Sequence, residues 1–257
     1  MKKFSKYFII FLIMIMMIFQ SYTIAFARSG GGGSGGSSGG SGGSSGGGGH
    51  SGTRYYSDRG TGRSNPLGNV IFIIFIGAIW QRENIICKIK VTRKNSQAKN
   101  LIAYLKKIDN DYSDEILDKR VEETYFKMQE AWTNRDTEIS REYMSDSIYD
   151  LHTSKLAWMK VRNQRNILNN IKLLDFKPVS IKHYKDNSKD VIWFYIKGSM
   201  IDYIINEETN EVIDGNFKSN SFVEFWKFIK KDNKWVIDTI SQKDEVYIDE
   251  FIIMSEE

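Results

Sequence analysis

The chain has 257 residues, of which 26% are charged, and its formal net charge is only +4. Because the basic residues gather after one apolar segment, this mild charge argues against a nucleic-acid-binding protein. The single cysteine, Cys87, excludes an intrachain disulfide and a cysteine-rich metal site.

Residues 1–27 have the three parts of a secretory signal peptide. Three lysines lie within the first six residues, an apolar run follows at 7–19, and Ala25 and Ala27 give a small-x-small cleavage pattern. Cleavage there would leave Arg28 as the first residue of the mature chain. An uncleaved signal anchor is the alternative, and both place the following residues outside the cytoplasmic membrane.

Residues 28–66 are predicted to form an extracytoplasmic tether, and they are rich in glycine and serine as far as Gly52. This composition cannot bury enough apolar surface to offset the entropy of the chain, so we predict a disordered coil. The tract lacks the Gly-Lys-Ser ending of a phosphate-binding loop.

Residues 67–87 are predicted to form a transmembrane helix, whose length would be about 30 Å at 1.5 Å per residue. The unbroken apolar run from Val70 to Trp80 is short for a span. However, Trp80 stands where an interfacial aromatic residue belongs, and Arg82 can extend toward the headgroups. The run also has no polar face that an interfacial helix would expose. A buried helix of the folded domain is the alternative.

Basic residues accompany the end of this segment and outnumber those before it, which predicts the orientation of the chain. By the positive-inside rule, the C-terminal part lies in the cytoplasm. The signal peptide indicates the same direction. We therefore predict a single-pass protein of the cell membrane, after signal cleavage, with a cytoplasmic C-terminal domain. The bases expected to contact the membrane are Arg82, Lys88, Lys90, Arg93, Lys94 and Lys99.

Residues 88–112 are predicted to form a basic juxtamembrane linker. Its apolar residues recur near helical spacing and are Ala98, Leu101, Ile102, Leu105 and Ile108. A basic amphipathic helix beside a bilayer would bind anionic lipid headgroups. A solvated connector explains the same pattern, and both interpretations remain open.

A globular domain is predicted at residues 113–242, followed by a C-terminal tail at 243–257. The domain opens with three helices. A second, short helix follows Asp136, and a third follows Asp146 with apolar residues continuing to Ile167. The first helix carries an apolar stripe of Leu117, Val121, Tyr125, Met128 and Trp132.

The second half of the domain changes to the pattern of strands, which are rich in β-branched and aromatic residues. Turn residues separate them, so we predict antiparallel pairing. Helices followed by a strand meander indicate an α+β fold with the helices on one face of a curved sheet. The predicted strands are 171–184, 191–205, 220–230 and 234–241.

An ordered set of motifs in residues 114–242 resembles the Tim-forty-four-like domain family. The set comprises Gln129-Glu130-Ala131-Trp132, Asp136, Asp214-Gly215, Phe225-Trp226-Lys227-Phe228 and Trp235-Val236-Ile237-Asp238. The family includes the C-terminal domain of a mitochondrial inner-membrane translocase subunit and bacterial membrane-anchored relatives. The resemblance implies a nuclear-transport-factor-two-like cone, in which three helices and a bent antiparallel sheet enclose an apolar pocket. It also implies membrane association, lipid contact and a link to protein transport.

The alternative of an enzyme has few residues to support it. Related folds include isomerases and dehydratases with an acidic or histidine base in the pocket. The candidate bases are His183, Asp202, Glu224 and Asp238. His152 and His183 lack metal-ligand partners at useful spacing, so we expect neither a metal nor a cofactor. We predict a protein without enzymatic activity.

Aromatic residues around Glu224 are the best candidates for a ligand or partner pocket. The residues that we expect to line it are Trp132, Trp193, Tyr195, Glu224, Trp226 and Phe228. Residues 191–196 are apolar at every position, which predicts a sheet covered on both faces, by helices on one and by lipid, another protein or a second copy on the other. The expected activity is binding of anionic lipid or a protein partner. The rival interpretation is an extracytoplasmic domain tethered to the surface.

Overall fold

The computed structural model describes the backbone of residues 66–256, and the side chains of Arg82 and of residues 85–256. The predicted signal peptide and the Gly/Ser tract before Pro66 lie outside the described residues. Two compact units divide the described chain, with the boundary between Lys90 and Val91.

Helix α2 (Pro66–Leu105) is the first described element. Proline fits the first turn of a helix because it has no N–H to leave unpaired there. The predicted span 67–87 is helical within α2, but most of its side chains lie outside the described residues. In the part of the chain whose structure is described, no helix is long and apolar enough to cross a membrane.

The last turns of α2, from Val91 onward, belong to the compact unit that contains the rest of the domain, which we call the domain unit. Val91, Ala98, Ile102 and Leu105 are at most 3% exposed, and the last three belong to the hydrophobic core. The apolar residues Ala98, Ile102 and Leu105 therefore contact neither lipid nor solvent, because they are buried in the same unit as the predicted domain. Ile108, the last of the predicted apolar residues, is 69% exposed. Whether the bases of this stretch contact lipid stays a prediction.

Helix α3 (Asp114–Asn134) follows the short η1 turn (Asn110–Tyr112). The Ser113 hydroxyl accepts a hydrogen bond from the Ile116 amide and caps the start, and Arg135 ends the helix in the left-handed conformation at φ 56°. The predicted stripe from Leu117 to Trp132 is buried, as its spacing requires.

The η2 turn (Thr137–Tyr143) and helix α4 (Asp146–Val161) complete the helical layer. Both begin at predicted caps or next to them, since Asp136 caps η2 and Ser145 caps α4. The extension of the third helix to Ile167 is wrong, because Ile167 lies in a strand.

Five strands form one sheet in the order β4-β3-β2-β1-β5. They are β1 (Gln164–His183), β2 (Val191–Asn206), β3 (Val212–Lys231), β4 (Lys234–Gln242) and β5 (Ile253–Ser255). Neighbours among β1 to β4 pair antiparallel, whereas β5 pairs parallel to β1. The α+β class is confirmed, and the sheet is mixed rather than wholly antiparallel.

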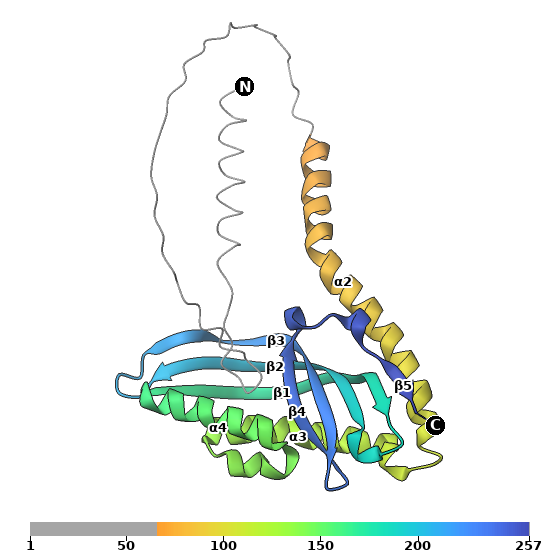
Figure 1. Cartoon of the computed structure of the whole chain (residues 1–257). Coiled ribbons are helices and arrows are strands. Elements are labelled where there is room, and N and C mark those ends of the chain that lie inside the picture. Colours follow the sequence, from red (N-terminus) through yellow and green to blue (C-terminus); the bar gives the residue numbers. More distant parts are fainter. Residues whose placement is uncertain (1–65, 257) are drawn as a thin grey trace, which may run out of the picture. The chain divides into compact units, whose positions relative to one another are not determined.

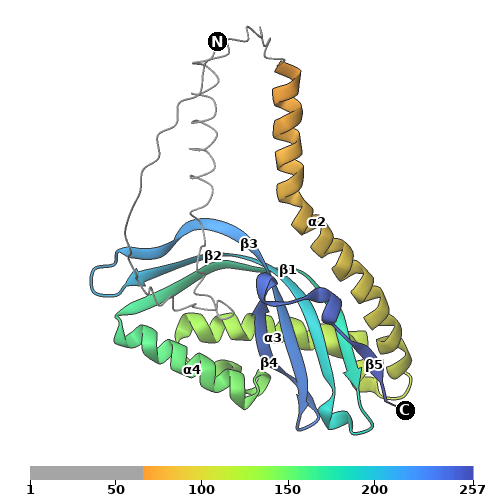
Figure 2. The ribbon, with the colours of Figure 1, turned by 45° about the horizontal axis from the view of Figure 1, so that its top comes forward.

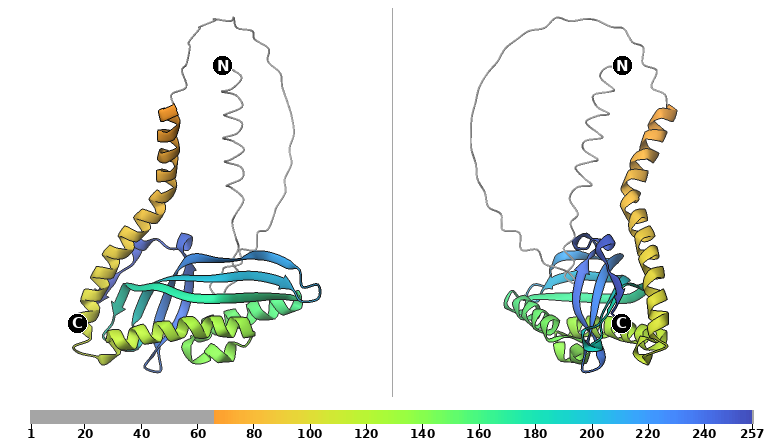
Figure 3. Two further views of the ribbon diagram at one scale, coloured as in Figure 1. Left: turned by 180° about the vertical axis from the view of Figure 1, so that it is seen from behind. Right: turned by 45° about the vertical axis from the view of Figure 1, so that its right-hand side comes forward.

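The sheet has a helix side and an outer side (Figure 1). Both views of Figure 3, and the tilted view of Figure 2, place α3 and α4 on the same side. Ile192, Phe194 and Ile196 of β2 face these helices, and each is at most 1% exposed. Alternation along the strand then directs Trp193 and Tyr195 to the outer side.

The chain's own C-terminal segment covers part of the outer side. Phe251 follows the turns η4 (Lys243–Glu245) and η5 (Ile248–Glu250), and its ring lies 5.4 Å from that of Trp193 and 5.5 Å from that of Phe225. The second layer over residues 191–196 is therefore intramolecular there, not a partner. Residues 243–256 are an ordered part of the domain unit instead of a tail.

Candidate binding site

The six predicted pocket residues separate onto the two sides of the sheet. Trp132, Trp226 and Phe228 belong to the core on the helix side. Glu224 lies on that side as well, two residues from Trp226 along β3. Trp193 and Tyr195 lie on the outer side, where their ring neighbours are Phe251 and Phe225. One pocket cannot contain all six side chains.

Glu224 is fully buried and is held by two donors. Trp226 Nε1 donates to its Oε2 at 2.9 Å, and Gln242 Nε2 donates to its Oε1 at 3.0 Å. Lys155 of α4 is close enough to interact with it: burial lowers the pKa of Lys155, while Glu245 and Glu224 act to raise it. The carboxylate thus links β3 to β4 and faces α4.

Asp202 and Trp132 are connected through a residue that we did not predict. Trp132 Nε1 donates to Asn166 Oδ1 at 2.9 Å, and Asn166 Nδ2 donates to Asp202 Oδ1 at 2.7 Å. The His152 ring lies 5.3 Å from the Trp132 ring. All four side chains are at most 4% exposed. No sequence signal indicated this chain of hydrogen bonds, since Asn166 follows two polar residues and is one of three asparagines between residues 166 and 170.

His183 lies in a different cluster, near the connection from β1 to β2. Its Nδ1 is 2.9 Å from Asp190 Oδ2, and Tyr112 of η1 donates a hydrogen bond to the same carboxylate. Burial, and then Asp190, raise the pKa of Tyr112 far above its ordinary value. This cluster fastens η1 to the sheet. The remaining candidate base, Asp238, is paired with Lys227 at 2.6 Å.

The predicted basic residues differ in what they contact. Arg82, Lys88, Arg93 and Lys99 are exposed, and Lys90 is half-buried. Lys94 instead donates from Nζ to two backbone carbonyls, of Asp249 at 3.1 Å and of Phe251 at 2.5 Å. It therefore holds the C-terminal segment. Among the described residues, no group of three acidic, histidine or cysteine side chains could hold a metal ion.

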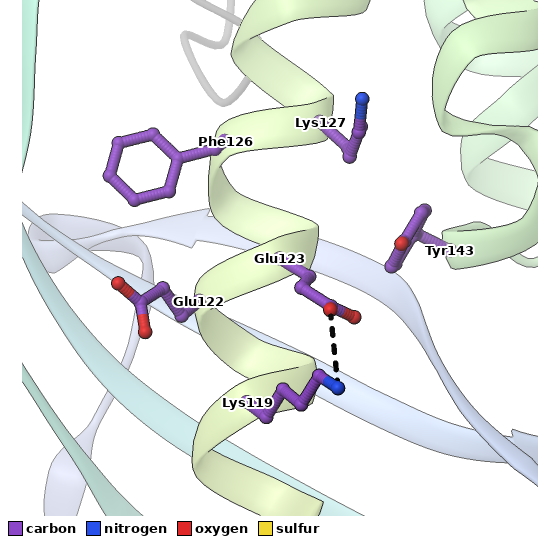
Figure 4. A pocket seen from close by; sticks show the side chains of 6 residues that line it. All are labelled: Lys119, Glu122, Glu123, Phe126, Lys127 and Tyr143. Carbon is purple, nitrogen blue, oxygen red and sulfur yellow. Dashed lines mark ion pairs between the residues drawn. The ribbon is translucent and has the colours of Figure 1, made fainter.

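Two adjoining hollows follow the exposed face of α3, which the sequence did not lead us to expect. The larger one, about 420 Å³, lies between α3 and η2 (Figure 4). The smaller one, about 220 Å³, lies between α3 and the turn from β3 to β4. Lys119 and Glu123 line both hollows and form an ion pair of 4.0 Å. The larger hollow is lined by Lys119, Glu122, Glu123, Phe126, Lys127 and Tyr143.

Comparison with known families assigns the chain. The Tim44-like domain matches residues 98–242, which is more than half of the chain. The chain belongs to the Tim44-like domain family. The matched region begins at Ala98, the residue of α2 that is 0% exposed, so the Tim44-like domain includes the buried end of that helix.

Several solved structures are similar to the Tim44-like chain at low identity. The intermembrane space region of the chloroplast protein ARC6 is 12% identical, covers 51% of this chain and 95% of its own, and has a TM-score of 0.38. A protein of unknown function with a cystatin-like fold from Nostoc punctiforme is 10% identical, with coverages of 47% and 85% and a TM-score of 0.27. A protein from Xanthomonas campestris that is described as a polyketide cyclase is 14% identical, with coverages of 48% and 84% and a TM-score of 0.26. At these TM-scores the likenesses carry no argument about function. A search of curated proteins found no match.

Proposed function

We propose that this protein is a non-enzymatic binding module that residues 67–87 anchor in the cell membrane, with the Tim44-like domain in the cytoplasm. The domain would bind a protein partner or lipid at the membrane, in a process linked to protein transport. Membership of the Tim44-like family supports the binding role, and the signal peptide and the positive-inside rule support the location.

One observation carries the proposal: a single helix contains both the apolar run and the first residues of the domain core. The run ends at Trp80, the first buried residue of the domain unit is Val91, and α2 includes both. The exposed bases Arg93 and Lys99 lie in the same helix, where they would favour anionic headgroups.

The anchor is tested by alkaline extraction of membranes from cells that express the full chain. We expect the chain to stay in the membrane pellet. A variant with Ile73→Lys and Ile74→Lys should be extracted, because each lysine at the centre of a span costs about 3 kcal/mol. Extraction of the unchanged chain would contradict membrane anchoring.

We place the protein-partner site at the two hollows along α3. Their lining carries both signs of charge, with Lys119 and Lys127 beside Glu122 and Glu123, and the half-exposed ring of Phe126. Such a mixed surface suits a protein better than an anionic bilayer, which would select one sign. A photo-crosslinking residue at position 126 should give a discrete protein adduct in membranes, and one at Leu151 on α4 should not. A failure to form any adduct at 126 would contradict this placement.

An enzyme of the isomerase or dehydratase type is the alternative, and its candidate bases are Glu224 and Asp202. Both carboxylates are buried and accept hydrogen bonds from neighbouring side chains, which fits a structural role. Glu224→Gln keeps the size of the side chain and removes the charge. We expect this variant to support the protein's cellular role as well as the unchanged chain does, and loss of that role in a folded variant would favour the enzyme.

A further inference from the structure

Among the described residues, the elements that cover the outer side of the sheet lie over one of its halves. Near the C-terminus, Trp193, Tyr195 and Phe225 pack beneath Phe251. Figures 1 and 2 show that the paired strands β1, β2 and β3 continue well beyond this region, toward the turn that joins β2 to β3. The described elements that cover the outer side do not extend over that end.

Strand register brings a set of apolar side chains together on this uncovered end. Tyr203 of β2 is opposite Ile167 of β1, and Ile205 is opposite Val212 of β3. Phe217 stacks edge-on against Tyr203, with ring centroids 4.8 Å apart, although it is 67% exposed. We call these residues, together with Ile201, the distal patch. It consists of Ile167, Ile201, Tyr203, Ile205, Val212 and Phe217.

Basic residues lie beside the distal patch on the same side of the sheet. Arg165 is opposite Ile205, Lys172 is opposite Ser199, and Lys197 lies two positions before Ser199 on β2. Arg165 and Lys172 are exposed and Lys197 is half-buried. The acid among them, Asp175, is paired with Lys177 at 2.5 Å. Within the described part of the chain, no ion pair neutralises Arg165, Lys172 or Lys197.

An apolar patch bordered by bases that outnumber the one acid named above fits a particular occupant. Aromatic rings such as Tyr203 and Phe217 favour the headgroup level of a bilayer, and bases beside them attract anionic lipids. A second copy of the chain fits less well, because a two-fold axis through this face would bring each basic border close to its own copy. The charge therefore favours a lipid surface over self-association.

We propose that the distal patch is the surface by which the domain contacts an anionic bilayer. Tyr203 and Phe217 enter the headgroup region, and Arg165, Lys172 and Lys197 contact lipid phosphates. This inference rests on the proposed membrane location, and it adds a second, peripheral contact that is separate from the anchor and from the bases of α2.

A fluorophore that reports on lipid contact tests the proposal on the full chain. In a Cys87→Ser background, Phe217→Cys is labelled with an environment-sensitive dye and reconstituted into vesicles of phosphatidylcholine, with or without phosphatidylglycerol. The matched control is Phe126→Cys in α3, which lies on the helix side of the sheet, opposite to the distal patch. We expect spin-labelled lipids to quench the dye at 217 only when phosphatidylglycerol is present, and the dye at 126 in neither case.

The outcomes separate this proposal from the proposed anchor. If the chain does not float with vesicles, the anchor is wrong. If it floats but the dye at 217 behaves like the dye at 126, the distal patch does not contact lipid. If the fluorescence of the dye at 217 depends on the number of protein molecules per vesicle and not on phosphatidylglycerol, the distal patch binds a second copy of the chain instead of the bilayer. Lys172→Gln with Lys197→Gln, both away from the core, should reduce the quenched fraction about twofold or more, and an unchanged fraction would remove these bases from the contact.

Discussion

At the scale of single residues, Glu224 shows how a candidate catalytic group can instead hold two strands together. Replacing it with alanine leaves the Trp226 and Gln242 donors without this acceptor inside the protein. We expect Glu224→Ala to reduce the free energy of unfolding by about 2 kcal/mol. Glu224→Gln should lose less, since its amide oxygen still accepts. Unfolding followed by tryptophan fluorescence measures both, and equal stability of Glu224→Ala and the unchanged protein would contradict the structural role.

Gly198 is required by the close packing of β2 against α3. A Cβ atom at this position would collide with the ring of Phe222 and with the hydroxyl of Tyr125, which itself donates to the Lys172 carbonyl. We expect Gly198→Ala to reduce the free energy of unfolding by about 2 kcal/mol. The matched control is Ser221→Ala at an exposed position of the paired strand. Similar stability of the two variants would show that α3 can move away from β2 without destabilising the fold, and would contradict this prediction.

The pair of Asp238 and Lys227 makes stability depend on pH in the acid range. Burial alone would raise the pKa of Asp238, but hydrogen bonds from Lys227 and Ser145 outweigh it and hold that pKa below the ordinary 3.8. A group with a depressed pKa stabilises the fold above its unfolded pKa, and this contribution disappears as the pH falls through the folded pKa. The stability difference between the unchanged protein and Asp238→Asn should therefore shrink as the pH falls below 3.8. Urea unfolding at a series of pH values measures it, and a constant difference would contradict the assignment.

At the scale of elements, the C-terminal segment is bound by the end of α2. Lys94 donates to the carbonyls of Asp249 and Phe251, and Ser180 of β1 donates to the Ile252 carbonyl. We expect Lys94→Met to speed amide hydrogen exchange in residues 246–256 and to leave α3 unchanged. Lys99→Met, at an exposed position of the same helix, is the control. Equal exchange in the two variants would mean that Lys94 does not hold the segment.

Sequence periodicity correctly predicted helices with a wide apolar stripe. It failed where it had to indicate what covers an apolar face. The prediction for α3 is confirmed, because five apolar residues at helical spacing form a stripe that is stable only when it is buried in a core. The same spacing in Ala98, Ile102 and Leu105 was assigned to a bilayer or to a connector. Periodicity identifies an apolar face but not what covers it, and nearby bases suggested lipid.

The prediction of a single pocket with six lining residues was wrong for a related reason. Tyr195 pairs with Phe225, and Ile196 pairs with Glu224. Neighbouring residues of a strand point to opposite sides of the sheet, so Tyr195 and Glu224 do not share a side. The sequence does not contain this register. It also gave no sign that Phe251, in the segment that we expected to be a C-terminal tail, would cover Trp193, or that three residues of β5 would join the sheet in parallel.

At the scale of the whole molecule, the account joins a Tim44-like domain to a membrane segment through one helix. The family match covers residues 98–242, and α2 extends from Pro66 into that region. The proposed location depends on the direction in which residues 67–87 cross the membrane. Because Cys87 is the only cysteine, the direction can be measured with single engineered cysteines.

The most direct test labels such cysteines on intact cells with a membrane-impermeant maleimide. In a Cys87→Ser background, we expect Ser57→Cys to be labelled on intact cells. Lys185→Cys, at an exposed position of the domain, should be labelled only after the membrane is permeabilised. Equal labelling of Lys185→Cys before and after permeabilisation would place the domain outside the cytoplasm and contradict the account.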